Sequence, residues 1–318
     1  MSIIRQGGML MGGGDWRGEP KYDHGQKVFD YLKQAKLSNW SINDVLDDAA
    51  KNSRERDAKS QMQHRNDAKT AINSNIEGHV DIEYGGSVSK ATYVDGVSDL
   101  DCRVYINHSS LASKSPDEIK RYIAKQLKSK DPRSSVKIGG MGVTVKYHDG
   151  TEMQFIPAVR TRYGYKLPNG NRWSKVIYEE RFKRDFSRTN KKCGGQLYHL
   201  VTVLKKQNNL NPSSQKLSGH HIEAMANNIF KHYPKSAPRT LGAMMDYYYR
   251  YAPRQVVHRT RDKTGQSSFV DKDKLGGPAS KNRQAVARHM GRVRKILQRA
   301  QKTGDTTSLE RSINGKPT

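Results

Sequence analysis

Two aspartates separated by one residue follow a glycine-serine pair in the stretch GGSVSKATYVDGVSDLD, which covers residues 85–101. On a β-strand, residues i and i+2 point to the same face, so Asp99 and Asp101 can jointly hold hard divalent cations. Two such ions about 4 Å apart deprotonate an attacking hydroxyl and neutralise a leaving pyrophosphate. The spacing therefore predicts metal-assisted chemistry on phosphates, with two Mg²⁺ or Mn²⁺ ions per site.

The glycine-serine pair, Gly86 and Ser87, follows a predicted strand and favours phosphate binding. Backbone N–H groups and a hydroxyl in such a turn can hold a phosphate chain, particularly where a helix begins. Lys90 and Thr92 are further candidates for contacts with a nucleoside triphosphate. A glycine-serine pair alone is common, and Asp-x-Asp on a strand is more often a solvated edge. Their combination in one segment is what indicates a nucleotide site.

Around this segment, the pattern of apolar residues predicts an α+β unit. Helical spacing covers VFDYLKQAKL and then one long helix from Ser41 to about Ile76, which leads into a sheet. A second helix is expected from Ser115, as N-cap, with Pro116 in its first turn. Runs rich in β-branched and aromatic residues predict strands over residues 79–86, 100–106 and 135–138, and a hairpin over 142–159. The sheet is expected to be mixed or antiparallel.

After Pro157 the strand signals fade and helical periodicity dominates. The predicted organisation is an N-terminal arm over 1–24, a core over 25–158, a basic helical lobe over 159–302 and a frayed tail over 303–318.

Positive charge is concentrated in the second half of the 318-residue chain. The total is 57 Lys and Arg against 31 Asp and Glu, but residues 1–158 carry a net charge of only +2 and residues 159–318 carry +24. Such one-sided charge is typical of a polyanion-binding surface, and a solvated, solubility-promoting face is the alternative. The arginine-rich helix near the C-terminus supplies the candidate RNA contacts, which are Arg288, Arg292, Lys295 and Arg299.

The two cysteines, Cys102 and Cys193, are too few for a disulfide framework and are expected to be free thiols in a reducing compartment. The sequence contains no run of about 18 apolar residues that could cross a membrane. A cytoplasmic protein without a membrane partner is therefore expected.

The segment at residues 85–101 resembles the polymerase-β-type nucleotidyltransferase superfamily, whose motif places Gly-Ser ahead of Asp-x-Asp. It is most similar to the branch with archaeal-type CCA-adding enzymes, oligoadenylate synthetases, cyclic GMP-AMP synthase and the bacterial CD-NTases. RDKTGQSSFVDKDKLGG, followed by an arginine-rich helix, resembles the C-terminal end of the CD-NTases. The resemblance covers about residues 25–300. It implies a polymerase-β-like nucleotidyltransferase sheet core with a helical C-terminal lobe.

The resemblance also assigns roles outside the motif. It implies that Lys205, in LYHLVTVLKKQ, and Ser218, in LSGHHIEAM, hold the tail of the triphosphate, and that Ser218 with Glu223 forms a serine-plus-acidic-helix signature. The family's third carboxylate, three residues before Pro-Ala in TEMQFIPA, falls on Gln154. Glutamine can coordinate a metal through its carbonyl but cannot accept a proton as a carboxylate does. Glu152 shares its strand face at a shift of about 7 Å and is the alternative proton acceptor.

Three functions remain compatible with the sequence. The first is a CD-NTase-like enzyme that joins nucleoside triphosphates into a cyclic or short linear oligonucleotide for a downstream effector in anti-phage defence, with structured RNA as its activator. The second is a nucleotidyltransferase acting on tRNA 3′ ends. The third, motivated by Gln154, is an RNA-binding pseudoenzyme.

Overall fold

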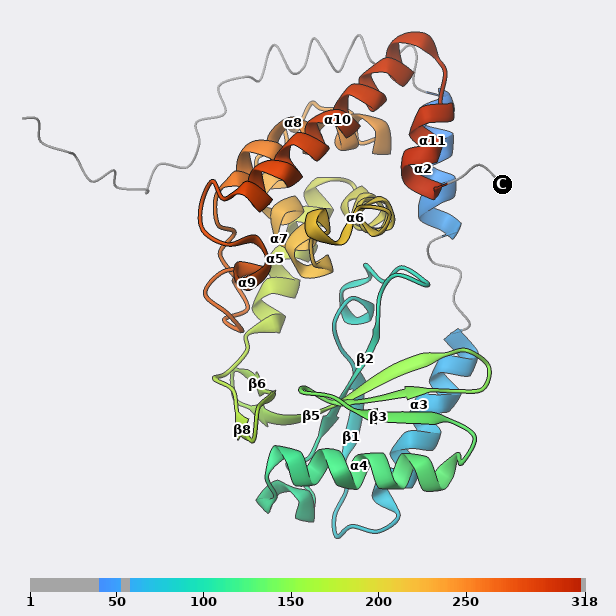
Figure 1. Cartoon of the computed structure of the whole chain (residues 1–318), viewed down its shortest axis with the longest axis vertical. Coiled ribbons are helices and arrows are strands. Elements are labelled where there is room, and N and C mark those ends of the chain that lie inside the picture. Colours follow the sequence, from blue (N-terminus) through green and yellow to red (C-terminus); the bar gives the residue numbers. More distant parts are fainter. Residues whose placement is uncertain (1–39, 53–57, 316–318) are drawn as a thin grey trace, which may run out of the picture.

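The computed structural model describes residues 40–52 and 58–315, which form a sheet domain and a helical lobe (Figure 1). The arm predicted over 1–24 and the helix predicted in VFDYLKQAKL lie outside the described residues. None of the helices in the described ranges is long and apolar enough to cross a membrane.

The sheet domain is built around one mixed sheet in the order β1-β2-β5-β4-β3, with β6 paired to the far end of β5. β2 and β5 run parallel, and the other neighbouring pairs run antiparallel. The strands are β1 (Asp81–Tyr84), β2 (Leu100–Tyr105), β3 (Ser135–Ile138), β4 (Val143–Lys146), β5 (Glu152–Thr161) and β6 (Gly164–Lys166). The mixed sheet and the predicted α+β fold class are confirmed.

Helices α3 (Ala58–Asn73) and α4 (Pro116–Lys130) contact each other and pack against the sheet. α4 begins where the sequence predicts, because Ser115 forms a capping box with Glu118. The Ser115 hydroxyl accepts from the Glu118 backbone N–H, and the Glu118 carboxylate accepts from the Ser115 N–H at 2.9 Å. Pro116 occupies the first turn, where its missing N–H has no cost.

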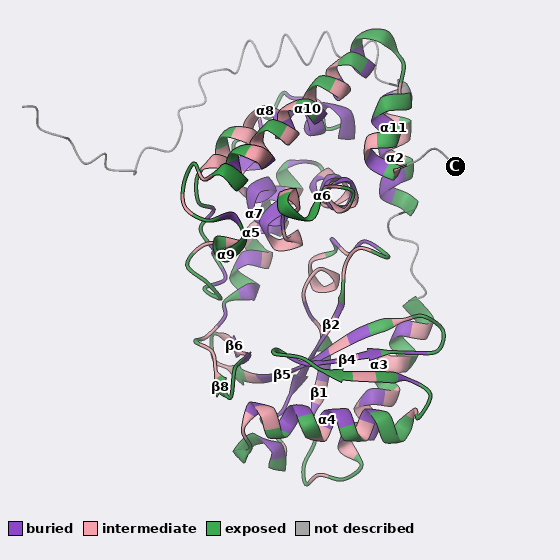
Figure 2. Cartoon of the chain, in the orientation of Figure 1, coloured by how far each residue is buried: buried purple, intermediate pink, exposed green. Residues whose placement is uncertain are grey.

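The second half of the chain forms the helical lobe predicted from its periodicity. Its helices are α5 (Glu179–Lys192), α6 (Gln196–Asn209), α7 (Gly219–Phe230), α8 (Leu241–Val257), α9 (Lys272–Leu275), α10 (Lys281–Thr303) and α11 (Thr307–Asn314). Buried residues occupy the facing sides of these helices, and exposed residues their outer sides (Figure 2). Two details differ from the prediction. Strand structure continues past Pro157 through β5, β6 and a hairpin of β7 (Pro168–Asn169) and β8 (Arg172–Trp173), and α11 replaces the expected frayed tail because Leu309 and Ile313 are fully buried.

A larger difference concerns α2 (Trp40–Asn52). The single long helix predicted from Ser41 to about Ile76 is instead two helices, α2 and α3, which pack in different parts of the molecule. α2 contacts α6, α8 and α11, so it completes the helical lobe. Its buried Ile42, Leu46 and Ala49 recur at helical spacing and join the lobe's hydrophobic cluster.

Candidate active site between the sheet and the helical lobe

The loop after β1 is seated directly on β2. The Gly85 backbone N–H donates to the Asp101 carbonyl at 2.7 Å, and Gly86 has a φ of +51°. A Cβ atom on Gly86 would lie 2.1 Å from Asp101 Oδ2, which is far inside van der Waals contact. Glycine is therefore required here by both the left-handed backbone and the close carboxylate. Ser87 follows as the N-cap residue of a short 3-10 turn, Val88–Lys90.

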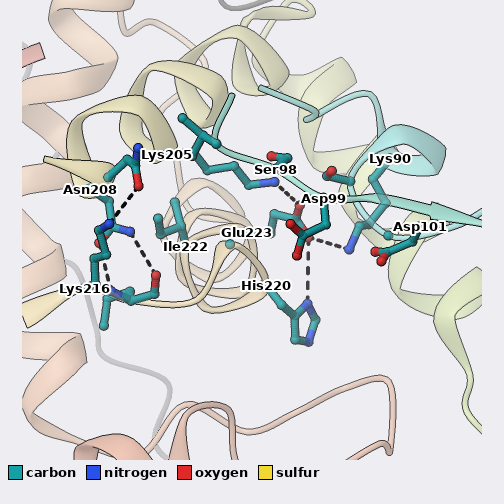
Figure 3. Close-up of a pocket in the computed structure, with 16 residues that line it drawn as sticks. Lys90, Ser98, Asp99, Asp101, Lys205, Asn208, Lys216, His220, Ile222 and Glu223 are labelled. Atoms are coloured by element: carbon teal, nitrogen blue, oxygen red, sulfur yellow. Dashed lines mark hydrogen bonds and ion pairs between the residues drawn. The ribbon is translucent and has the colours of Figure 1, made fainter. Parts of the chain in front are cut away.

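Asp101 has Gln154 as its neighbour in the sheet. The parallel register of β2 and β5 pairs Asp101 with Gln154 and Leu100 with Met153. Asp99 immediately precedes β2 and lies near Asp101 (Figure 3). Burial and the negative charge of Asp99 raise the pKa of Asp101 to about 6. Gln154 thus lies beside Asp101, the second aspartate of the Asp-x-Asp pair.

Glu152 occupies a different position. It is exposed at the start of β5, opposite Lys146 of β4. Together with Asp95, Asp99 and Asp149 it lines an acidic cavity of about 540 Å³. Glu152 therefore lies on the Asp99 side of the Asp99 and Asp101 pair, two residues from Gln154 along β5.

A cavity of about 310 Å³ opens in front of the aspartates, between the sheet domain and the lobe. Figure 3 shows its side chains converging from both parts of the molecule. The sheet domain supplies Gly86, Ser87, Lys90, Val97, Ser98, Asp99 and Asp101, and the lobe supplies Lys205, Asn208, Asn209, Lys216, Leu217, Gly219, His220, Ile222 and Glu223. The sequence-predicted Gly86, Ser87, Lys90, Asp99, Asp101 and Lys205 all line this one cavity.

A buried ion cluster joins the two parts of the molecule beside this cavity. Glu223 lies 2.7 Å from both Lys205 Nζ and Lys90 Nζ. Thr92, which the sequence suggested as a nucleotide contact, is fully buried and does not line the cavity. Its hydroxyl donates to Glu223 at 2.6 Å, and its carbonyl accepts from Lys205 at 2.9 Å. Burial opposes ionisation of Glu223, but the two ammonium groups hold its pKa well below the usual range. The contacts among Thr92, Lys205 and Glu223 therefore hold the sheet domain against the lobe.

Ser218 is the N-cap residue of α7. Its hydroxyl accepts from the His221 N–H at 3.2 Å, and its own N–H donates to Asp271 at 2.8 Å. Its neighbours Leu217 and Gly219 line the cavity, whereas Ser218 itself does not. The cap fixes where α7 begins, and the positive end of this helix faces a site suited to anions.

Sequence patterns do not identify several residues that line or surround the site. Arg103 is buried, ion-pairs with Glu179 at the start of α5 and donates to the Tyr84 carbonyl at 3.1 Å. Glu179 also accepts from the Tyr165 hydroxyl at 2.6 Å. The strand alternation carried a signal, since Arg103 lies two residues after Asp101 and so shares its face. No sequence pattern indicates that Lys216 lines the cavity. Its segment is held by Asn208, whose side-chain amide donates to the Leu217 carbonyl and accepts from the Leu217 N–H.

The donor set suits a hard divalent cation. Within the described ranges, no group of three or more His, Cys, Asp or Glu side chains is arranged to hold a metal ion. The oxygen donors at the cavity are the carboxylates of Asp99 and Asp101; Gln154 neighbours Asp101 in the sheet but does not line the cavity. Burial, and next the negative charge of Asp99, raise the pKa of Asp101, and a bound cation would offset both effects. Oxygen donors of this kind favour Mg²⁺ or Mn²⁺.

Comparison with known proteins gives a consistent fold. No protein-family model matches the sequence, and no curated protein matches it by sequence. CdnC from E. coli MS115-1, solved with ATP, aligns with a TM-score of 0.62 at 13% identity, over 91% of this chain and 97% of that chain. The CD-NTase CdnG from Bradyrhizobium diazoefficiens, in complex with GTP, aligns with a TM-score of 0.64 at 12% identity, over 86% and 94%.

DncV from Vibrio cholerae, a cyclic AMP-GMP synthase solved with its linear intermediate pppA(3′,5′)pG, aligns with a TM-score of 0.58 at 13% identity, over 91% and 90%. These alignments span both the sheet domain and the helical lobe. The fold implied by the resemblance of the Gly-Ser and Asp-x-Asp motif is thereby confirmed, and the chain has the nucleotidyltransferase fold of the CD-NTases.

Proposed function

We propose that the protein is a CD-NTase-like nucleotidyltransferase that makes a cyclic or short linear oligonucleotide from nucleoside triphosphates. The observation that carries the proposal is the seating of the Gly86 loop on Asp101. This contact joins a phosphate-binding turn to a metal-binding strand at the mouth of one cavity. Solved neighbours that contain ATP, GTP or a linear dinucleotide support the substrate class.

Each group of residues at the cavity has its own proposed role. A divalent cation held by Asp99 and Asp101 would supply the positive charge that activates a hydroxyl and stabilises pyrophosphate as it leaves. The backbone N–H groups around Ser87 and the N-terminus of α7, both at the same cavity, would bind the triphosphate. Lys205 contributes positive potential and holds the lobe in place through Thr92 and Glu223.

In the reaction, a ribose hydroxyl oxygen of one nucleotide bonds to the α-phosphorus of another. The bond from that phosphorus to the bridging oxygen breaks, pyrophosphate leaves, and the hydroxyl proton must be accepted. Gln154 offers a carbonyl oxygen to a metal but no site for that proton. The proton therefore passes to solvent or to Glu152, and the rate is expected to be low.

Activation by structured RNA is the second part of the proposal. Arg288, Arg292, Lys295 and Arg299 are all exposed along one face of α10. The opposite face buries Val286, Met290, Val293 and Leu297 against the lobe. A stripe of this kind fits a phosphate backbone. Anti-phage signalling through a downstream effector is proposed on the resemblance to CD-NTases alone.

An RNA-binding pseudoenzyme is the second candidate, and the position of Gln154 beside Asp101 favours it. Product analysis separates the candidates. The full chain is incubated with Mg²⁺ and α-³²P-labelled triphosphates, with and without duplex RNA or tRNA, and Asp101→Asn serves as the control. Phosphatase-resistant small products support the proposal, label in tRNA supports a tRNA nucleotidyltransferase, and RNA binding without any product supports the pseudoenzyme.

A further inference from the structure

A second cavity, of about 710 Å³, lies on the helical lobe beside the first. It is formed by one face of α5, the end of α7 and the loop over residues 261–265. Its lining residues are Tyr178, Arg181, Phe182, Arg184, Asp185, Arg188, Lys231, Arg261, Asp262, Lys263 and Gly265. The volume falls within the range of small-molecule sites.

The lining is strongly basic. Six of its side chains are Arg or Lys, and two are Asp. Asp185 lies 2.6 Å from Lys231 Nζ and 3.9 Å from Lys263 Nζ, so one carboxylate serves both lysines. Burial and the adjacent Lys231 ammonium lower the pKa of Lys263 to about 8. The cavity therefore holds more positive charge than its own carboxylates neutralise.

The second carboxylate, Asp262, is engaged by its own loop. It accepts from the Thr264 N–H at 2.8 Å, from the Thr264 hydroxyl at 2.6 Å and from the Ser267 N–H at 3.0 Å. The Tyr178 N–H donates to the Thr264 carbonyl at 2.7 Å and fixes the loop to the start of α5. These contacts position the wall of the cavity before any ligand binds.

The two cavities share a wall that contains the side chains of Phe182 and His220. Phe182 lines the basic cavity and contacts the ring of His220, which lines the first cavity, at a centroid distance of 5.2 Å. Lys90 also lines the first cavity, and its Nζ lies 5.8 Å from the centre of the Phe182 ring. His220 Nε2 also lies 3.2 Å from Asp262. A ligand in the basic cavity would thus lie beside the nucleotide site.

We propose that the basic cavity is a second polyphosphate-binding site. Three arginines at positions 181, 184 and 188 project from one face of α5, and guanidinium groups pair with phosphate oxygens through two parallel hydrogen bonds. Lys231 and Lys263 add point charges from the opposite side. The polyphosphate is either the tail of the second nucleoside triphosphate, whose hydroxyl attacks, or a free polyphosphate. The first source rests on the proposed function.

Direct binding of inorganic tripolyphosphate to the full chain tests the site. Calorimetry is expected to give two tripolyphosphates per chain, one in each cavity. The double variant Arg184→Glu with Lys263→Glu is expected to lose one of them. Arg121→Glu with Lys125→Glu, which reverses the same charges on exposed positions of α4, is the matched control and should keep both. One site per chain, unchanged by the cavity variant, would overturn the proposal.

A neutral variant tests whether the charge-reversed variant loses binding only because it misfolds. Arg184→Gln with Lys263→Gln should weaken the second tripolyphosphate by about tenfold or more, with an unchanged melting temperature. If the neutral variant binds as tightly as the unmodified chain, the charge of the cavity does not hold the ligand and the proposal falls. Displacement of tripolyphosphate by duplex RNA, but not by ATP, would show a nucleic-acid surface and would also overturn it.

Transfer kinetics distinguish the two sources. Labelled 2′,3′-dideoxy-ATP acts only as a donor, and α,β-methylene-ATP or adenosine acts only as an acceptor. If the acceptor's tail occupies the cavity, the Arg184→Gln and Lys263→Gln double variant raises KM for α,β-methylene-ATP about tenfold and leaves KM for adenosine unchanged. If a free polyphosphate occupies it, both acceptors respond equally and added tripolyphosphate changes the rate of the unmodified chain alone. Lys263-dependent binding in a chain without transfer activity would support the site while refuting the proposed function.

Discussion

Gly86 and Asp101 lie so close that any side chain at position 86 would overlap the Asp101 carboxylate, with a Cβ 2.1 Å from Oδ2. The Gly86 loop and Asp101 of β2 are therefore in direct contact, and a larger residue in the loop must displace one of the two.

Gly86→Ala should abolish nucleotide transfer, because the added methyl must displace either the loop or Asp101. Left-handed backbone at a non-glycine residue itself costs about 1–2 kcal/mol. Gly170→Ala is the control, since Gly170 has a φ of +62° but no atom within 4 Å of its would-be Cβ. Transfer rate and melting temperature are measured for both. A similar loss of activity in the two variants would show that backbone strain, and not contact with Asp101, causes the loss.

Asp101→Asn should abolish transfer while raising stability at neutral pH without divalent cations. The folded state raises the pKa of Asp101 to about 6, so it binds this proton more tightly than the unfolded chain does. The unmodified protein therefore loses stability as pH rises from about 4 to about 6, by up to about 3 kcal/mol, and the variant avoids this loss. Urea unfolding at pH 4 and pH 7.5 measures the difference, and Mg²⁺ should stabilise only the unmodified chain.

Gln154→Asp should raise the transfer rate by at least an order of magnitude, because a positioned general base contributes about 10²–10⁴-fold. The register places the new carboxylate beside Asp101. Gln154→Asn is the matched control and should bring no gain. If Gln154→Asp has no effect and Glu152→Gln lowers the rate instead, Glu152 is the proton acceptor.

Glu223→Gln should destabilise the protein by about 3–5 kcal/mol, because it leaves the buried Lys90 and Lys205 without their shared carboxylate. The control is Glu180→Gln, which removes the partner of Lys183 in an exposed ion pair and should cost at most about 1 kcal/mol. Urea unfolding compares the two. Equal effects would mean that the cluster does not hold the lobe to the sheet domain.

Binding of duplex RNA should weaken steeply with salt and depend little on sequence. Each phosphate contact lowers log K by about 0.7–0.9 per tenfold increase in salt. Arg292→Glu with Lys295→Glu, on the exposed face of α10, should flatten this slope without changing transfer in the absence of RNA. Fluorescence anisotropy at several salt concentrations measures the slope. A slope near zero in the unmodified chain would reduce the stripe to a solvated surface.

Local patterns predicted the parts of the site that lie close together in the chain. The i, i+2 spacing of Asp99 and Asp101 was enough to place them on one strand end, and Ser115 with Pro116 was enough to fix the start of α4. The partners of Lys205 could not be inferred in this way. Thr92 lies 113 residues from it, and only the packing of the lobe on the sheet brings the two together.

The wrong prediction for α2 has the same cause, because local patterns do not identify distant partners. Ile42, Leu46 and Ala49 show that one face is buried, but periodicity does not say against which surface. The basic residues of the second cavity are similar, because Arg181, Lys231 and Lys263 come from three separate segments. Their common position depends on the tertiary fold.

The packing of α2 also sets an order of events during synthesis. The sheet domain from residue 58 onward is contiguous in the chain, so it can fold as soon as β6 has left the ribosome. α2 is made earlier, yet its partners α6, α8 and α11 lie about 150 residues or more further along. Its apolar face therefore stays exposed, or bound by a chaperone, until α6, α8 and finally α11 have been translated.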